Sequence, residues 1–135
     1  SEVIKNQNAI DKYKVSIGKV VPSNGEVDTD PRDGYKVITS NRVIPPGYVF
    51  TESYLLLKDF NNPIEAHNFD KYMALKFPRF MMKQTLSSMN ISKQNFMFVP
   101  FLDFSHPWTD EMLYKKYNLT EDEIAFIESM IRPME

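Results

Sequence analysis

The sequence contains no cysteine, only two histidines and only four glycines. Without cysteine, a disulfide scaffold, a thiolate zinc site and a cysteine nucleophile are all excluded. The glycines are scattered, so no glycine-rich phosphate loop is present. No apolar run approaches the roughly 20 residues of a membrane-spanning helix, and no basic start with an apolar stretch marks a secretory signal. We therefore expect a cytoplasmic protein with no membrane contact.

The chain has an ordinary globular composition, with 42% hydrophobic and 25% charged residues among its 135. This length suits one domain, and area scaling indicates that folding buries about two-thirds of its surface. We expect an α/β body over residues 1–105 and a helical tail of the same domain over residues 106–135. Because the chain begins at Ser1 without an initiator Met, we also expect it to be a piece of a longer protein.

Charge is unevenly distributed along the chain, although the net charge is only −2. Residues 1–105 carry a net charge of +2, and residues 106–135 carry −4. Between residues 71 and 102 there are five basic residues and no acidic one. A local basic zone attracts phosphate even on a slightly acidic chain, since salt limits the reach of each charge to about 8–10 Å. A solvated face that lacks acids is the alternative interpretation.

Several segments have the alternation or composition of strands. Residues 12–21 alternate as a half-buried strand does, and 35–39 read as a second short strand. Pro45-Pro46-Gly47 predicts an extended segment followed by a turn. Residues 48–60 are rich in aromatic and aliphatic side chains and predict one or two buried strands. Residues 96–101 predict a short strand at an edge, because they include a proline.

The clearest predicted helix covers residues from about 64 to 86. Asn62 can cap it, Pro63 can occupy its first turn, and apolar residues recur at helical spacing. Pro78 interrupts the pattern and predicts a kink or a split near Phe77.

Two short helices are expected to close the chain. Thr109 can cap the first, with Met112 and Leu113 facing inward. Thr120 and Glu123 match a capping box for the second. Strands followed by helices predict an α+β fold, with a small antiparallel or mixed sheet and a helical layer.

No constellation of catalytic residues is visible. His67 and His106 have no partner at metal-ligand spacing, and no nucleophile elbow surrounds any serine. Asp28, Asp30 and Asp33 resemble a calcium loop, but the acidic residue required at the twelfth position is missing. We therefore expect no enzyme activity, no metal and no cofactor in this chain.

The remaining chemical signal is a basic stripe, Lys76, Arg79 and Lys83, at positions that share one face of a helix. Lys93 extends it in the following loop. Such residues contact DNA phosphates, whereas bases are read by Arg, Lys, Asn or Gln at a groove. Arg42 and Gln94 are the favoured base-reading candidates. The other loop candidates, each of which can equally be a solvated residue, are Arg32, Asn41, Gln84, Asn90 and Asn95.

Several motifs along the chain are distinctive in their order and spacing, although no one of them is catalytic. The shorter motifs are Thr51-Glu52-Ser53-Tyr54-Leu55, Lys76-Phe77-Pro78-Arg79-Phe80, Phe98-Val99-Pro100 and Asp103-Phe104. The longest run comprises Trp108-Thr109-Asp110-Glu111, Leu113-Tyr114-Lys115-Lys116-Tyr117, Leu119-Thr120, Glu123-Ile124-Ala125-Phe126-Ile127-Glu128 and Arg132-Pro133-Met134. Together these motifs resemble a family of bacterial restriction-modification proteins related to the type IIG and type I restriction enzymes, and the similarity covers residues 11–135.

The resemblance implies a DNA target-recognition domain at the C-terminus of a larger enzyme. Family members carry a nuclease or helicase part and an adenine-specific DNA methyltransferase part, so catalysis would belong to parts absent from this chain. The implied partners are double-stranded DNA and the remaining domains of the parent enzyme. The chain departs from the family at Pro78, where an aromatic residue is usual.

Two other functions remain open. The acidic, apolar tail from Trp108 to Glu135 can instead dock on the parent enzyme without reading DNA, and exposed Trp108, Phe126 and Ile127 would favour that role. A small hydrolase or nuclease is the third possibility. It would need carboxylates gathered around Glu52, Asp59 and Asp103.

Overall fold

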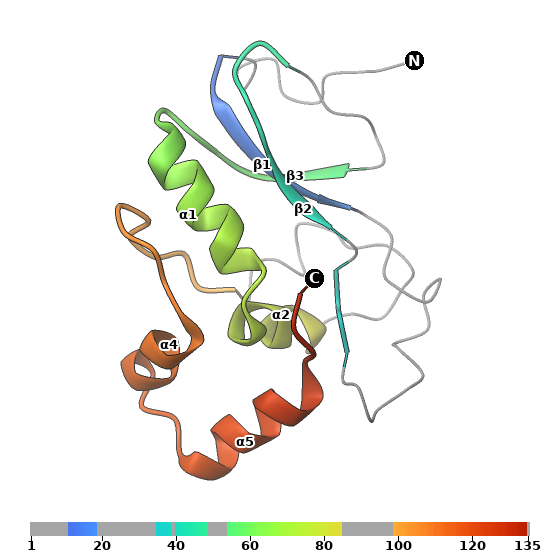
Figure 1. The fold of residues 1–135 in the computed structure, drawn as a ribbon, viewed down its shortest axis with the longest axis vertical. Coiled ribbons are helices and arrows are strands. Elements are labelled where there is room, and N and C mark those ends of the chain that lie inside the picture. Colours follow the sequence, from blue (N-terminus) through green and yellow to red (C-terminus); the bar gives the residue numbers. More distant parts are fainter. Residues whose placement is uncertain (1–10, 19–34, 39, 49–53, 85–98, 135) are drawn as a thin grey trace.

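A computed structural model describes residues 11–18, 35–38, 40–48, 54–84 and 99–134 of the chain. In these ranges a three-stranded sheet lies against a helix, and further helices follow below it (Figure 1). The strands are β1 (Tyr13–Gly18), β2 (Asn41–Ile44) and β3 (Tyr54–Phe60). The helices are α1 (Pro63–Met73), α2 (Lys76–Lys83), α4 (Asp110–Lys116) and α5 (Glu121–Met130). The predicted α+β class is confirmed.

The sheet is antiparallel with strand order β2-β1-β3, so β1 is central. The alternation of apolar and polar residues in β1 predicted that only one face of this strand is buried. Lys14 and Ser16 on the opposite face are buried as well. The Lys14 ammonium donates hydrogen bonds to the carbonyls of Lys12 and Pro45, at 2.9 and 3.3 Å. Burial lowers the pKa of Lys14, against the opposing effect of Asp59 and Asp11. The prediction of a half-buried strand was therefore wrong, because both faces of β1 are covered.

The turn after β2 agrees with the sequence. The Tyr48 amide donates to the Pro45 carbonyl at 3.3 Å, and Gly47 has a φ of +84°. Proline at the second position and glycine with positive φ at the third are typical of a type II turn.

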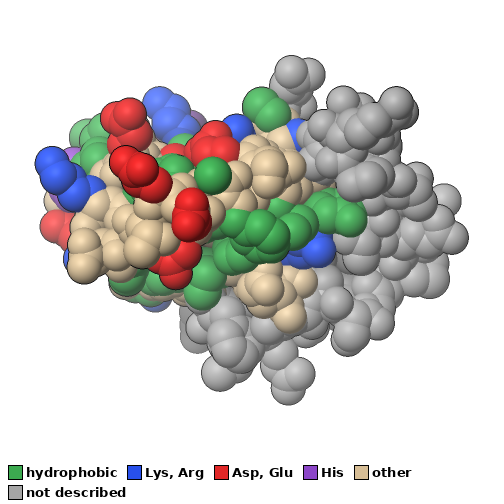
Figure 2. Space-filling model, turned by 90° about the horizontal axis from the view of Figure 1, so that it is seen from below, with side chains coloured by type: hydrophobic (Ala, Val, Ile, Leu, Met, Phe, Trp, Pro, Cys, Tyr) green, Lys and Arg blue, Asp and Glu red, His purple; other side chains and the backbone are tan. Residues whose placement is uncertain are grey.

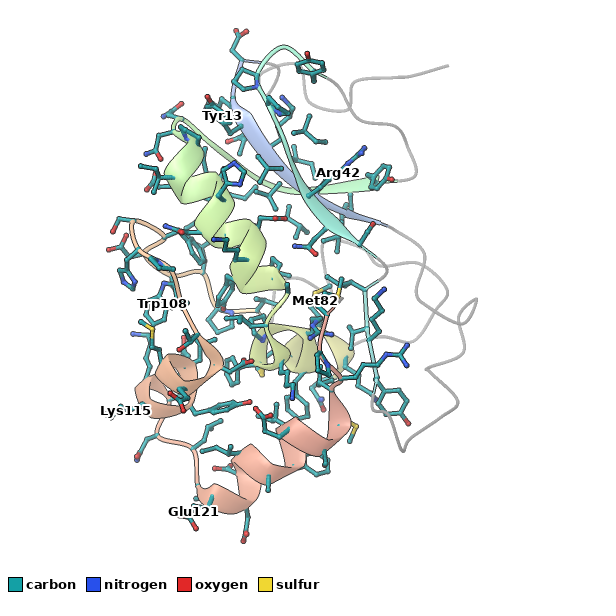
Figure 3. The ribbon with its side chains drawn as sticks, viewed as in Figure 1. Tyr13, Arg42, Met82, Trp108, Lys115 and Glu121 are labelled. Carbon is teal, nitrogen blue, oxygen red and sulfur yellow. The ribbon has the colours of Figure 1, made fainter. Side chains whose placement is uncertain are left out.

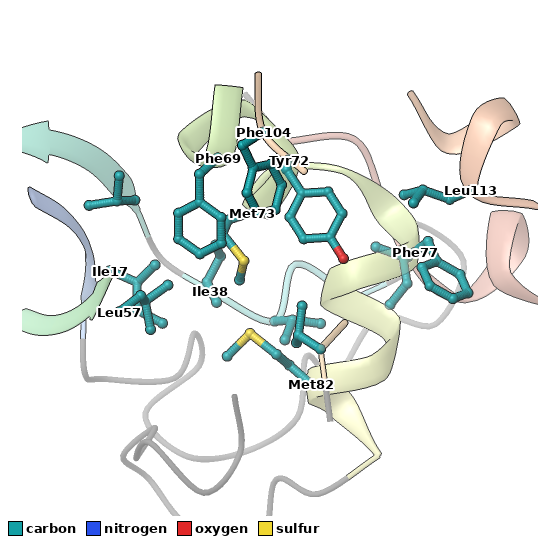
Figure 4. Close-up of a cluster of buried hydrophobic side chains, with 14 of the residues drawn as sticks. Ile17, Ile38, Leu57, Phe69, Tyr72, Met73, Phe77, Met82, Phe104 and Leu113 are labelled. Carbon is teal, nitrogen blue, oxygen red and sulfur yellow. The ribbon is translucent and has the colours of Figure 1, made fainter. Parts of the chain in front are cut away.

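Helix α1 begins as predicted and carries the aromatic centre of the core. The Asn62 side chain accepts a hydrogen bond from the Glu65 amide at 2.8 Å. On the buried side of α1, Phe69 meets Phe104 edge to face at 4.9 Å between ring centroids. Tyr72 lies 5.1 Å from the same Phe104 ring and donates its hydroxyl hydrogen to the Pro100 carbonyl (Figure 4). The segment after residue 99 is thereby held against α1.

The long predicted helix is split into two, as Pro78 indicated. The break lies at Ala74 and Leu75 rather than at Phe77. Helix α1 ends at Met73, and Leu75 is extended with φ −71° and ψ 162°. Pro78 explains the position of the break. In a continuous helix its ring would clash with the Ala74 carbonyl and its missing N–H would leave that carbonyl without a donor. Restarting at Lys76 places Pro78 in the first turn of α2, where no intrahelical N–H is needed.

The two C-terminal helices carry their predicted caps. The Thr109 hydroxyl accepts from the Met112 amide at 3.2 Å. The Thr120 and Glu123 capping box is complete, with bonds of 3.1 and 2.8 Å. Leu113 is fully buried as predicted, but Met112 is exposed and its inward orientation was wrong. The buried residues of α4 are Leu113 and Tyr114.

Residues 35–38 form no regular strand, which corrects that prediction. Tyr35 instead makes an isolated parallel bridge with Ile131, so the chain end after α5 runs beside this segment and α2 (Figure 1). Val37 has a φ of 74°, and the Ile38 amide donates to the Lys36 carbonyl at 2.9 Å. This is the geometry of a γ-turn, which a regular strand does not contain.

Two further predictions concern residues at the edges of the described ranges. Residues 99–101, the described end of the strand expected over 96–101, form no strand, while 96–98 lie outside the described residues. The sequence predicted one or two strands over residues 48–60. One of them is β3, and residues 49–53, where a second could lie, are outside the described residues. Among the helices that the structure describes, none is long and apolar enough to cross a bilayer.

Candidate functional site

Arg79, the centre of the expected basic stripe, does not face solvent. Its side chain has 0% exposure. Its Nε donates to the carbonyls of Ala74 and Leu75, each at 3.1 Å, and its Nη1 donates to the Lys36 carbonyl at 3.0 Å. Burial lowers the pKa of Arg79 to about 10, while the nearby Asp110 carboxylate acts to raise it. The prediction that Arg79 contacts DNA phosphate was wrong, because its guanidinium is occupied inside the fold.

The break between α1 and α2 explains why Arg79 points inward. The extended Leu75 changes the direction of the chain, so the face of α2 can no longer be extrapolated from α1. The buried residues of α2 are Phe77, Pro78, Arg79 and Met82. Arg79 also supplies the hydrogen bond that Pro78 cannot give to the Ala74 carbonyl. The proline and the arginine that follows it therefore act together at this joint.

Lys76, the first residue of the stripe, is engaged with α5. Its ammonium lies 2.8 Å from Oε1 of Glu128, and Oε2 of the same carboxylate accepts the Tyr114 hydroxyl hydrogen at 2.6 Å. Burial and the bond to Glu128 raise the pKa of Tyr114. For Glu128, burial acts to raise the pKa, but the bonds from Lys76 and Tyr114 outweigh it and the pKa falls. One carboxylate thus joins α2, α4 and α5.

We predict that Glu128→Gln makes stability less sensitive to acid. A carboxyl with a lowered folded pKa stabilises above its unfolded pKa, about 4.3, and that stabilisation disappears as pH falls through the folded value. The Glu128 side chain is 42% exposed, so the difference between wild type and variant should be only about 0.5 kcal/mol at pH 7. Urea unfolding at pH 7 and pH 3 measures it; an equal difference at both pH values would contradict the prediction.

Lys83 and Arg42 lie over aromatic rings and retain solvent contact. The Lys83 ammonium is 4.3 Å from the Tyr35 ring centroid, and the Arg42 guanidinium is 4.2 Å from the Tyr54 centroid. Arg42 is exposed on β2, at the opposite end of the molecule from Lys115 and Glu121 (Figure 3). Lys93 and Gln94 lie outside the described residues. Among the described residues, Lys76, Arg79 and Lys83 therefore do not form the exposed stripe that their spacing predicted.

The N-terminus of α2 depends on Asp110, a residue that the sequence did not single out for this role. Its Oδ2 accepts from the Lys76 amide at 3.0 Å and its Oδ1 from the Phe77 amide at 2.8 Å. Leu75, the residue before the helix, makes no side-chain cap. The sequence does show that α2 lacks a capping side chain of its own at Leu75. It does not show that Asp110, 33 residues after Phe77, supplies the cap.

An apolar groove lies where α2 meets α5, with a volume of about 530 Å³. We call it the α2–α5 groove. Figure 2 shows a band of hydrophobic side chains on this lower face, beside a group of acidic side chains. Phe126 in the groove is 53% exposed, whereas the adjacent Ile127 is buried and Trp108 is half-buried. The described residues that line the groove are Phe77, Phe80, Met81, Pro100, Tyr117, Leu119, Asp122, Glu123, Phe126 and Ile127.

The described carboxylates do not form a catalytic cluster. Asp59 lies 3.9 Å from the Lys12 ammonium, and Asp103 accepts a hydrogen bond from the Ser105 amide. Glu52 lies outside the described residues. Within the described ranges, no three His, Asp or Glu side chains gather as they would around a metal ion.

These contacts define a small α+β domain with a joined helical unit and an apolar groove. A scan against protein-family models found no match to the chain, and searches of curated proteins and of solved structures found none either. The similarity to restriction-modification proteins therefore stays a prediction from the motifs.

Proposed function

We propose that this chain is the DNA target-recognition domain of a bacterial restriction-modification enzyme. It would be the C-terminal part of a cytoplasmic protein whose other domains, including an adenine-specific methyltransferase, perform the catalysis. In this role it binds double-stranded DNA and the remaining domains of its parent, with no catalytic group or cofactor of its own.

The observation that carries the proposal is the mutual packing of residues from separate resembling motifs. Asp110 of the closing run caps α2 at the Lys76-Phe77 motif. Phe77 stacks on Tyr117 at 5.4 Å, and Phe80 meets Phe126 edge to face at 5.9 Å. Motifs separated by some 30 to 50 positions thus belong to one packed unit. This supports a shared fold for the matched segments and indicates that their role is structural.

DNA contact then has to come from cations outside the packed unit or at its margin. Arg42 on the sheet and the partly exposed Lys83 meet that condition. Lys93 and Gln94 keep their proposed roles toward phosphate and base. Phosphate contacts of this kind position a domain on DNA, and the bases would be read from the loops.

We expect Arg42→Ala/Lys83→Ala to weaken DNA binding in a salt-dependent manner. Loss of the Lys83 phosphate contact removes roughly 0.9 from the slope of log K against log salt, and loss of the Arg42 base contact lowers K at every salt concentration. Fluorescence anisotropy with labelled duplex DNA over a salt series measures the slope. Lys115→Ala/Lys116→Ala is the matched control, since it removes two exposed cations from α4. The proposal that Arg42 and Lys83 contact DNA would be contradicted if the wild type does not bind at the lowest salt, or if the double variant binds as the wild type does.

The exposed Phe126 favours a second candidate function, docking of this chain on another domain of its parent without DNA readout. A large aromatic side chain that stays 53% exposed within an apolar groove is characteristic of an interaction surface. The docking role predicts that Phe126→Ser weakens binding of this chain to the other domains of its parent.

A further inference from the structure

The α2–α5 groove has walls that are already ordered. Phe77 and Tyr117 are nearly parallel at an interplanar angle of 12°, and Phe80 stands at 89° to Phe126. These ring contacts shape the groove before anything binds, which lowers the side-chain entropy lost on binding. The volume of about 530 Å³ lies within the range of about 300–1,000 Å³ that is usual for binding sites.

The charged side chains of the groove are of one sign. Among its described lining residues only Asp122 and Glu123 are charged, and both belong to the first turn of α5. Glu123 is bound by the Thr120 amide in the capping box. Asp122 and the preceding Glu121 are exposed. The first turn of α5 therefore gives its side of the groove a negative rim, which repels an acidic partner and attracts a basic one.

We propose that the α2–α5 groove binds a basic, apolar protein segment. Such a segment would insert a large apolar side chain against Phe126 and place Lys or Arg beside Asp122 and Glu121. Binding of apolar anchors in a preformed groove, with complementary charges at its rim, is an established mode of peptide recognition. The inference rests on the docking role above, names the chemistry of its partner, and is independent of DNA contact by Arg42 and Lys83.

Selection from a phage-displayed library of random 12-residue peptides tests this proposal. Three complete 135-residue chains serve as targets: wild type, Phe126→Ser, and Ile64→Ser. Ile64 is 66% exposed on α1, so Ile64→Ser is a matched apolar-to-serine control outside the groove. We expect the wild type and Ile64→Ser to enrich peptides with large apolar residues and an excess of Lys and Arg. Phe126→Ser should lose them, and the best synthetic peptide should bind it about tenfold more weakly.

Charge reversal tests the electrostatic part. Asp122→Lys should weaken binding of the selected peptide by about three- to tenfold, with a smaller effect at high salt. Glu111→Lys is the matched control, because Glu111 occupies in α4 the same position in the first turn that Asp122 occupies in α5. It should leave the affinity within about twofold of wild type.

Three results would overturn the proposal, and they are distinguishable. If no enriched peptide depends on Phe126, the groove is not a docking site and the docking role falls with it. If the enriched peptides are neutral or acidic, docking stands but the basic partner does not. If sedimentation shows a dimer of the wild type that Phe126→Ser dissociates, a second copy of the chain occupies the groove. The anisotropy result with DNA is unaffected in each case.

Discussion

Arg79→Ala is expected to lower the free energy of unfolding by about 3 kcal/mol, the largest effect among our predictions. The partly buried carbonyls of Ala74 and Leu75 would lose the Arg79 donor, and the Lys36 carbonyl would also lose it but keep its bond from the Ile38 amide. Each desolvated acceptor left without a partner costs about 1–3 kcal/mol, and the cavity left by the deleted side chain adds to the loss, although burying the guanidinium charge itself costs energy that the variant recovers. Urea unfolding, with a comparison of m-values, measures the change.

Two further variants separate the causes of that loss. Arg79→Met keeps most of the side-chain volume but no donor, so it should lose about 2 kcal/mol and rank between wild type and Arg79→Ala. Lys83→Ala removes a cation from the same helix at a partly exposed position and should change stability by less than about 1 kcal/mol. If Arg79→Met is as stable as the wild type, the hydrogen bonds merely offset the cost of burying the charge.

Asp110→Ala is expected to lower the free energy of unfolding by about 2 kcal/mol. The variant removes both acceptors from the amides of Lys76 and Phe77 and the negative charge near the N-terminus of α2. Loss of a capping side chain typically costs about 1 kcal/mol and reaches about 2 kcal/mol in proteins. Because the cap also joins α4 to α2, we expect the loss for this substitution to lie at the upper end of that energy range.

Amide hydrogen exchange shows whether the loss is local to this cap. In Asp110→Ala the amides of Lys76 and Phe77 should exchange faster relative to those in the middle of α1. Glu111→Ala is the control, since Glu111 is the exposed neighbour in the same turn and should change stability by less than about 0.5 kcal/mol. Equal destabilisation by both substitutions would point to α4 itself rather than to its contact with α2.

The Arg79 and Asp110 contacts change how the basic residues after Tyr72 are interpreted. Lys76 and Arg79 are separated by a spacing that favours a phosphate-binding face, yet one pairs with Glu128 and the other is buried. Both residues also belong to one of the motifs on which the proposed function rests. Their structural roles shift the proposed DNA contacts toward Arg42, Lys83 and Lys93.

Local chemistry was sufficient to predict the class of fold and the start of α1, α4 and α5. The caps at Asn62, Thr109 and Thr120 and the turn at Gly47 depend on residues within four positions of one another. Hydrogen bonds over such short separations are visible as sequence patterns. The break forced by Pro78 was predictable for the same reason, although it lies at Ala74 and Leu75 and not at Phe77.

The roles of Arg79, Asp110 and Glu128 were decided by contacts between segments that are distant in sequence. Arg79 reaches the Lys36 carbonyl, Asp110 caps a helix that begins 34 residues earlier, and Glu128 meets Lys76 across 52 residues. A periodic pattern shows which residues share a helix face, but it does not show what that face packs against. Once Leu75 changed the direction of the chain, tertiary packing alone determined that a charged side chain would be buried and that Phe126 would remain exposed.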